Sequence, residues 1–200
     1  MYYVMTMIKK VTNFLYEVGT MRRLPRMHRQ TLLTDDATDT IAAHSYRVTM
    51  IGWHLAKMEK LDPYKTVMMC LLHDVGEIRT GDQNWIHKKY IKAFDSEVIE
   101  DQLGTLPFSD LEDFAVEYND KTTPEAIVAK DADLLDQLLL LREYEWQGNK
   151  EATIWLEGKA ERGNAQIKML NSDSAKELAQ EILTQNPTQW WDQVWTNKNR

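Results

Sequence analysis

An adjacent histidine and aspartate, His73 and Asp74, follow an apolar run near the middle of the chain. The run at 67–72 and the helical spacing of apolar residues up to Ile78 predict one buried helix, which Thr80-Gly81-Asp82 ends. Burying an ionisable side chain is costly unless it is paired or binds a metal ion. The fold must therefore bring polar partners, or a metal ion, to His73 and Asp74.

Apolar residues recur at three- and four-residue spacing along most of the chain, which is typical of amphipathic helices. Helices are expected over about residues 8–18, 40–60, 63–78, 85–103, 110–118, 124–148, 151–170 and 175–183. No run alternates apolar and polar residues as a strand does, and no repeat or glycine-rich phosphate loop occurs. We predict an all-α fold, a helical bundle that forms a single domain over residues 1–200.

Composition narrows the classes of function. With 43% hydrophobic and 28% charged residues, the chain fits a globular protein and not a disordered one. The net charge of −7 disfavours a nucleic-acid polymer as partner, because phosphate backbones bind basic surfaces. The single cysteine, Cys70, rules out an internal disulfide and fits a cytoplasmic location. The apolar N-terminal stretch is too short to span a membrane, so we expect no membrane anchor.

Three expected helices each carry a buried group that binds metals. His44 starts the apolar stripe of the helix at 40–60, His73 and Asp74 lie in the next, and Asp131 or Asp133 lies in the helix at 124–148. Such a mixed nitrogen and oxygen set suits one divalent ion of Co, Mn, Fe, Ni, Zn or Mg. Four protein ligands leave two positions of an octahedral ion for water and substrate.

The ordered set resembles the signature of HD-domain metal-dependent phosphohydrolases. The resemblance covers residues 14–148 and leaves 149–200 as additional C-terminal helices. Its branch of 5′-deoxynucleotidases and small relatives is indicated by three motifs, which are His44-Ser45-Tyr46-Arg47, the segment from His73-Asp74 to Asp82, and Glu143-Tyr144-Glu145. Lys130 and Ala132 match the family pattern that precedes the last ligand. That pattern favours Asp133 and leaves Asp131 as the second choice, because helical periodicity alone favours Asp131.

The resemblance implies that the substrate is a (deoxy)nucleoside monophosphate, which loses its 5′-phosphate to a metal-activated water. Glu77 would accept a proton from this water or orient it, and Asp82 would protonate the leaving oxygen or help to orient the water. Arg23 and Lys88 would offset phosphoryl charge. Leu24 stands where the deoxynucleotidases have a tryptophan implicated in rejecting ribonucleotides, so the sugar preference does not follow from the resemblance.

Two other functions fit the same motif. One is hydrolysis of nucleoside triphosphates with release of triphosphate, and the other is a non-catalytic, metal-bound interaction protein that kept the fold. Glu77 and Asp82 favour a catalyst over the latter. The resemblance also implies a homodimer, for which a tryptophan-rich tail (Trp190, Trp191 and Trp195) is a candidate contact.

Overall fold

The longest helix, α9 (Pro124–Trp146), lies at the centre of the computed structural model, which describes residues 2–108, 110–158, 165–192, 194 and 198. Thr123 caps its start by accepting a hydrogen bond from the amide of Ala126, and Pro124 takes the first helical position. Leucines cover much of its circumference, and Leu135, Leu138 and Leu141 are buried. Because α9 is apolar on several sides, other helices pack around it.

Two helices carry the sequence motifs to one face of α9. These are α3 (Ile41–Met58) and α4 (Pro63–Leu72), which pack on each other and on α9. Gly52 permits their close contact, because a Cβ at this position would overlap Cys70 Sγ. On the other side of α9 lie α10 (Lys150–Leu156), α11 (Ala165–Met169) and α12 (Asp173–Thr184).

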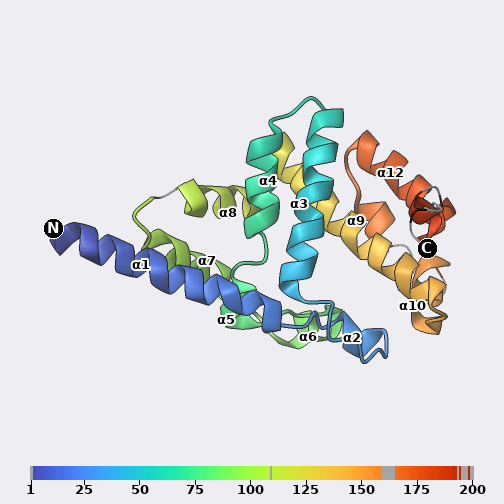
Figure 1. The fold of residues 1–200 in the computed structure, drawn as a ribbon, viewed down its shortest axis with the longest axis horizontal. Coiled ribbons are helices and arrows are strands. Elements are labelled where there is room, and N and C mark those ends of the chain that lie inside the picture. The colour runs from blue at the N-terminus through green and yellow to red at the C-terminus, as the bar shows by residue number, and fades with distance from the viewer. Residues whose placement is uncertain (1, 109, 159–164, 193, 195–197, 199–200) are drawn as a thin grey trace.

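Short elements surround this centre. They are η1 (Gly19–Arg23), α2 (His28–Thr31), α5 (Glu77–Thr80), α6 (Trp85–Tyr90), α7 (Asp95–Ile99), the π-helical turn η2 (Glu100–Gly104), α8 (Asp110–Asp120) and η3 (Gln189–Trp191). The first helix, α1 (Tyr2–Val18), projects to one side (Figure 1). The all-α prediction is confirmed, because the described residues form no strand and pair only in an isolated bridge between Pro25 and Thr40.

The prediction of one helix from 63 to 78 was wrong, because α4 ends at Leu72 and His73 begins a turn. His73 Nδ1 lies 2.7 Å from the Cys70 carbonyl oxygen, which a continuing helix would use for the amide of Asp74. The backbone hydrogen bonds that follow join residues three positions apart, as in the tighter 3-10 helix, and one of them runs from the Val75 amide to the Leu72 carbonyl. His73 and Asp74 therefore lie directly after the end of α4 and not within a continuous helix.

The predicted helix from 85 to 103 was also wrong as a single element. It is divided into α6 and α7 by residues 91–94, where Ile91 has extended backbone angles. No glycine or proline marks this break in the sequence. Within the described residues, no helix is long and apolar enough to cross a membrane. Trp195, one of the three tail tryptophans, lies outside the described residues.

Candidate metal centre

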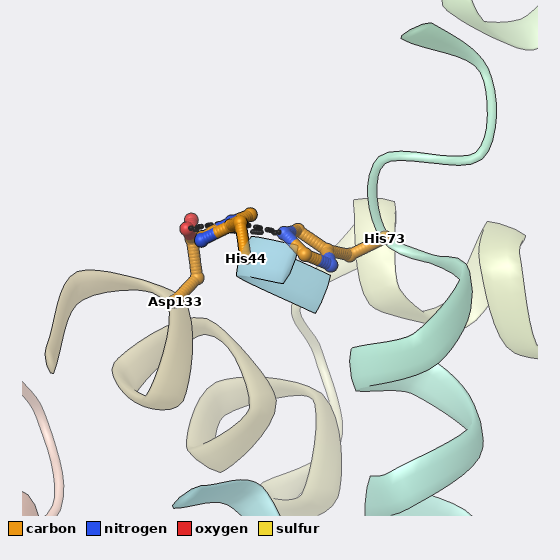
Figure 2. Close-up of side chains that lie close together, drawn as sticks. All are labelled: His44, His73 and Asp133. Atoms are coloured by element: carbon orange, nitrogen blue, oxygen red, sulfur yellow. Dashed lines mark hydrogen bonds and ion pairs between the residues drawn. The ribbon is translucent and has the colours of Figure 1, made fainter. Parts of the chain in front are cut away.

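Four side chains from three segments converge at one point. His44 comes from the first turn of α3, His73 and Asp74 from the turn after α4, and Asp133 from α9. Figure 2 shows His44, His73 and Asp133 pointing toward one another. One ligand atom of each of these three lies within 4.8 Å of the others. Asp74 Oδ2 joins them at 3.0 Å from His73 Nε2 and 3.4 Å from His44 Nε2.

Hydrogen bonds fix the orientation of both imidazoles. His73 Nδ1 donates to the Cys70 carbonyl, and His44 Nδ1 lies 2.6 Å from Asp136 Oδ2 and 2.6 Å from Arg26 Nη1. The neutral ring of His73 therefore carries its hydrogen on Nδ1 and presents the lone pair of Nε2. The ring of His44 does the same when its Nδ1 hydrogen bonds to Asp136. The two Nε2 atoms lie 3.0 Å apart, and His44 Nε2 lies 3.2 Å from Asp133 Oδ1. Two lone pairs and two carboxylates directed at one point suit a divalent cation.

The charges of this cluster also favour a cation. Burial and Arg26 both act to lower the pKa of His44, yet hydrogen bonds to three carboxylates outweigh them and hold it well above its ordinary value. Burial would raise the pKa of Asp133, but Lys130 and the two imidazoles lower it well below the usual range. The pKa of Asp74 is lowered too, by the same two imidazoles, so Asp74 and Asp133 both keep their negative charge. A proton on His44 or a bound metal ion would offset this charge.

Asp131 and Asp133 face different parts of the protein. Asp131 is fully buried and accepts hydrogen bonds from the amides of Asn171 and Ser172, and from the Ser172 hydroxyl at 2.7 Å. Asp133 accepts from Lys130 Nζ at 2.6 Å and reaches His44. The periodicity argument that favoured Asp131 identified a buried carboxylate, but one that binds the segment before α12.

A network behind His44 was missed by the sequence analysis. Asp136 accepts from His44 and from Arg47 Nε at 2.5 Å, and Arg26 Nη1 lies 3.3 Å from it. Arg47 also donates to Glu143 at 2.6 Å. Asp136 lies one helical turn after Asp133 on α9, which was the available signal. Such outer partners orient a ligating histidine and raise its basicity.

The cluster opens into a cavity of about 520 Å³. Glu77, Asp82 and Lys88 line it, as the sequence analysis expected of residues near the reaction. Burial raises the pKa of Glu77 to about 9, and the charges of Asp74 and Asp82 add to this effect. Glu77 Oε2 is buried and has no hydrogen-bond partner among the described residues.

The N-terminal arm, the basic segment at 21–30 between α1 and α3, contributes different residues from those expected. Arg23 is exposed and Leu24 is half-buried, and neither lines the cavity. Arg26, only 6% exposed, and His28 line it instead. Asp82 Oδ2 accepts a hydrogen bond from the amide of Met27, so this side chain ties the arm to the turn before α6.

Comparison with known proteins places the chain in a family. The model of the HD domain family matches residues 21–174. The chain belongs to the HD domain family.

Two curated relatives share part of the sequence. The 5′-deoxynucleotidase HDDC2 of Dictyostelium discoideum is 31% identical over 122 residues, which cover 54% of this chain and 64% of that protein. The protein of the same name from Xenopus laevis is 26% identical over 150 residues, which cover 68% and 70% of the two chains. The chain thus matches less than two thirds of the Dictyostelium relative.

Solved structures have the same fold. A conserved hypothetical protein from Pyrococcus furiosus superposes with a TM-score of 0.69 at 25% identity, over 86% of this chain and 98% of that one. A predicted metal-dependent phosphohydrolase from Magnetospirillum magnetotacticum gives a TM-score of 0.68 at 23% identity, over 88% and 93% of the two chains.

Proposed function

We propose that this protein is a metal-dependent phosphohydrolase that removes the 5′-phosphate from (deoxy)nucleoside monophosphates. The observation that carries the proposal is the convergence of His44, His73, Asp74 and Asp133 at the wall of a cavity that Glu77 also lines. Membership in the HD domain family and the names of the two curated relatives support the proposal.

We further propose that the four residues hold one divalent ion of Co, Mn, Fe, Ni, Zn or Mg. When bound, such an ion acidifies a coordinated water and offsets charge on the phosphoryl group. The residues of the chain supply the remaining parts. Asp136 and the Cys70 carbonyl hold the two imidazoles in position. Glu77 lines the same cavity, and its unpartnered Oε2 is available to hydrogen-bond and orient a water there.

Lys88 is assigned to the phosphoryl oxygens, because it lines the cavity and makes no ion pair with any described residue. Asp82 is assigned first to holding the arm, through its bond to Met27. A direct proton transfer by Asp82 and a phosphate contact by Arg23 stay as predictions from the resemblance. The turnover of Asp82→Asn and Arg23→Ala tests both.

The deciding experiment is a substrate screen. Chelator-treated protein is reloaded with each metal and incubated with nucleoside mono-, di- and triphosphates, while orthophosphate and tripolyphosphate are measured separately. We expect orthophosphate from monophosphates, and its loss in His73→Ala but not in His54→Ala, which alters an exposed histidine of α3. Release of tripolyphosphate would favour a triphosphohydrolase, and no release with any metal would favour a binding protein.

We also propose a homodimer, as the resemblance implies. Light scattering after gel filtration measures the oligomeric state directly. Exposed apolar residues on α1 (Ile8 and Leu15, 57% and 61% exposed) and in the tail (Trp190, 67%) are alternative contacts. Leu15→Glu and Trp190→Glu separate them, because only the variant at the interface should yield monomers. A monomeric wild type would overturn the dimer.

A further inference from the structure

His28 lines the cavity from the first turn of α2, next to Arg26. Arg26 Nη2 lies 3.1 Å from His28 Nε2. A guanidinium group can only donate, so Nε2 accepts and the neutral ring carries its hydrogen on Nδ1. Burial lowers the pKa of His28 to about 3, and the charges of Arg26 and His44 contribute, so the ring is neutral at physiological pH. The tautomer of His28 is therefore defined by its contact with Arg26.

The Nδ1–H group of His28 has no acceptor. Its nitrogen is buried, and none of the described residues accepts its hydrogen. Buried N–H groups are almost always paired in folded proteins, with protein atoms or with ordered water. His28 is also one of the residues that line the cavity, so a ligand whose binding brings an oxygen to this nitrogen would supply the missing acceptor.

The surroundings of His28 indicate the charge of that acceptor. The guanidinium of Arg26 lies on one side, and Lys88 is close enough for its charge to contribute to the lowered pKa of His28. The carboxylate of Asp133 acts in the opposite direction, but its effect on the pKa of His28 is smaller than that of Arg26. A neutral donor beside a guanidinium suits an anionic oxygen and disfavours a cation. Phosphoryl oxygens have this property.

The backbone before His28 is fixed from both sides. The amide of Met27 donates to Asp82, and its carbonyl accepts from Asn84 Nδ2 at 3.0 Å. Asn84 is 1% exposed and also donates to Gln30 Oε1 at 2.8 Å. His28 is thus held in place before any ligand arrives, as effective binding requires.

We propose that His28 is a substrate-binding residue of this cavity, which donates its Nδ1 hydrogen to an oxygen of the phosphoryl group that Lys88 also binds. The proposal rests on the phosphohydrolase function for the identity of the substrate. The binding of phosphate itself can be measured without turnover.

A merely structural role for His28 predicts a different pattern of variants. In that case only Nε2 matters, because it supports Arg26. Asparagine places its amide nitrogen where histidine has Nδ1, since both atoms are bonded to Cγ. Glutamine places its amide group near the position of Nε2. His28→Asn thus keeps a donor at the first position, and His28→Gln keeps an acceptor at the second.

The experiment compares His28→Asn, His28→Gln and His28→Ala with wild type in the metal-loaded protein. Calorimetry gives the Kd of inorganic phosphate, and a nucleoside monophosphate gives KM and kcat. We expect His28→Gln and His28→Ala to raise Kd and KM about tenfold or more, and His28→Asn to stay within about threefold. His54→Asn on the exposed side of α3 is the matched control, and circular dichroism verifies that each variant is folded.

Three results would overturn the proposal. They are unchanged phosphate affinity in His28→Ala, the reverse ranking of His28→Asn and His28→Gln, and no phosphate binding by wild type. If wild type binds phosphate but hydrolyses no nucleotide, the proposed function fails while the phosphate contact of His28 is still decided by the ranking of Kd values.

Discussion

Two aspartates of α9 lie two positions apart and serve different parts of the protein. Asp133 faces the imidazole of His44, and Asp131 binds the amides of Asn171 and Ser172. Residues two positions apart on a helix point about 200° apart, so the two side chains leave α9 on nearly opposite sides. The structure therefore separates the candidate metal centre from helix docking at the scale of single residues.

The same substitution at the two positions should have different effects. Asp133→Asn removes a charged ligand, so we expect loss of bound metal and at least about a hundredfold loss of turnover with little change in folding. Asp131→Asn places an amide against backbone donors, so we expect about 1–3 kcal/mol lower free energy of unfolding with metal retained. Metal analysis and urea unfolding measure both. The assignment fails if Asp131→Asn, and not Asp133→Asn, loses the metal.

Glu77 should make the metal-free protein sensitive to pH. Burial raises its pKa to about 9 from an ordinary 4.5, so the native state keeps a proton that the unfolded chain releases between these values. Stability then falls as pH rises through this range. Glu77→Gln removes the ionisable group and with it this loss of stability. We expect the free energy of unfolding of the variant at pH 8 to exceed that of wild type by at least about 1.4 kcal/mol, which corresponds to one pKa unit. Equal urea midpoints at pH 8 would contradict the raised pKa.

At the scale of elements, the close contact of α3 and α4 positions the two histidines. Gly52 of α3 lies against Cys70 of α4, one turn before His73. Any added volume there should separate the two helices and so displace His44 from His73.

We expect Gly52→Ala to lower the free energy of unfolding by about 1–3 kcal/mol and to weaken metal binding. Cys70→Ala in the same chain should restore much of both, because it removes the overlapping sulfur. Gly19→Ala is the control, since a Cβ at that position meets no atom within 4 Å. A double-mutant cycle with no coupling between positions 52 and 70 would contradict this account.

The long helices were predictable from sequence, because local signals define their ends. Pro124 and the N-cap Thr123 start α9, and Ser172 caps α12 by accepting from the amide of Ala175. The predicted helix at 151–170 was wrong as a single element, because α10 ends at Leu156 and α11 begins at Ala165. The break after Leu72 was not predictable, because it follows from the bond between His73 Nδ1 and the Cys70 carbonyl. The residues from 91 to 94 carry no breaking signal, so the end of α6 at Tyr90 depends on tertiary packing.

The residues of the candidate metal centre likewise include some that the sequence identified and some that it did not. His44, His73 and Asp74 were identified by residue type and order, and they lie together. The choice of Asp133 needed the family resemblance, because α9 is buried on several sides. Contacts between segments that are distant in sequence could not be predicted. One example is the contact of Arg26 with Asp136, which lie 110 residues apart in sequence. Its position on the arm, three residues after Arg23, gave no local sign of burial.

At the scale of the whole molecule, the metal centre should contribute to global stability. Its groups come from α3, the end of α4 and α9, so a bound ion would link three segments that the unfolded chain separates. An ion at a hundred times its Kd adds about 2.7 kcal/mol, or about 5–10 °C in Tm for a chain of this size. We expect a chelator to lower Tm by this amount and metal to restore it. Differential scanning calorimetry of wild type and His73→Ala tests this, because the variant should not respond.

The buried position of Asp131 also bears on where the chain can be shortened. A protein ending at Gly148 would keep all the proposed metal ligands and lose the amides of Asn171 and Ser172 that pair with this carboxylate. The shortened protein would also expose the apolar face of α9 that Trp155, Leu156 and Ile182 cover. We therefore expect the shortened protein to be insoluble or to lack the cooperative thermal transition of the full chain. A folded, metal-binding product would contradict this. The family match runs to residue 174 and includes both partners, so it agrees with a fragment boundary that lies beyond the last proposed metal ligand.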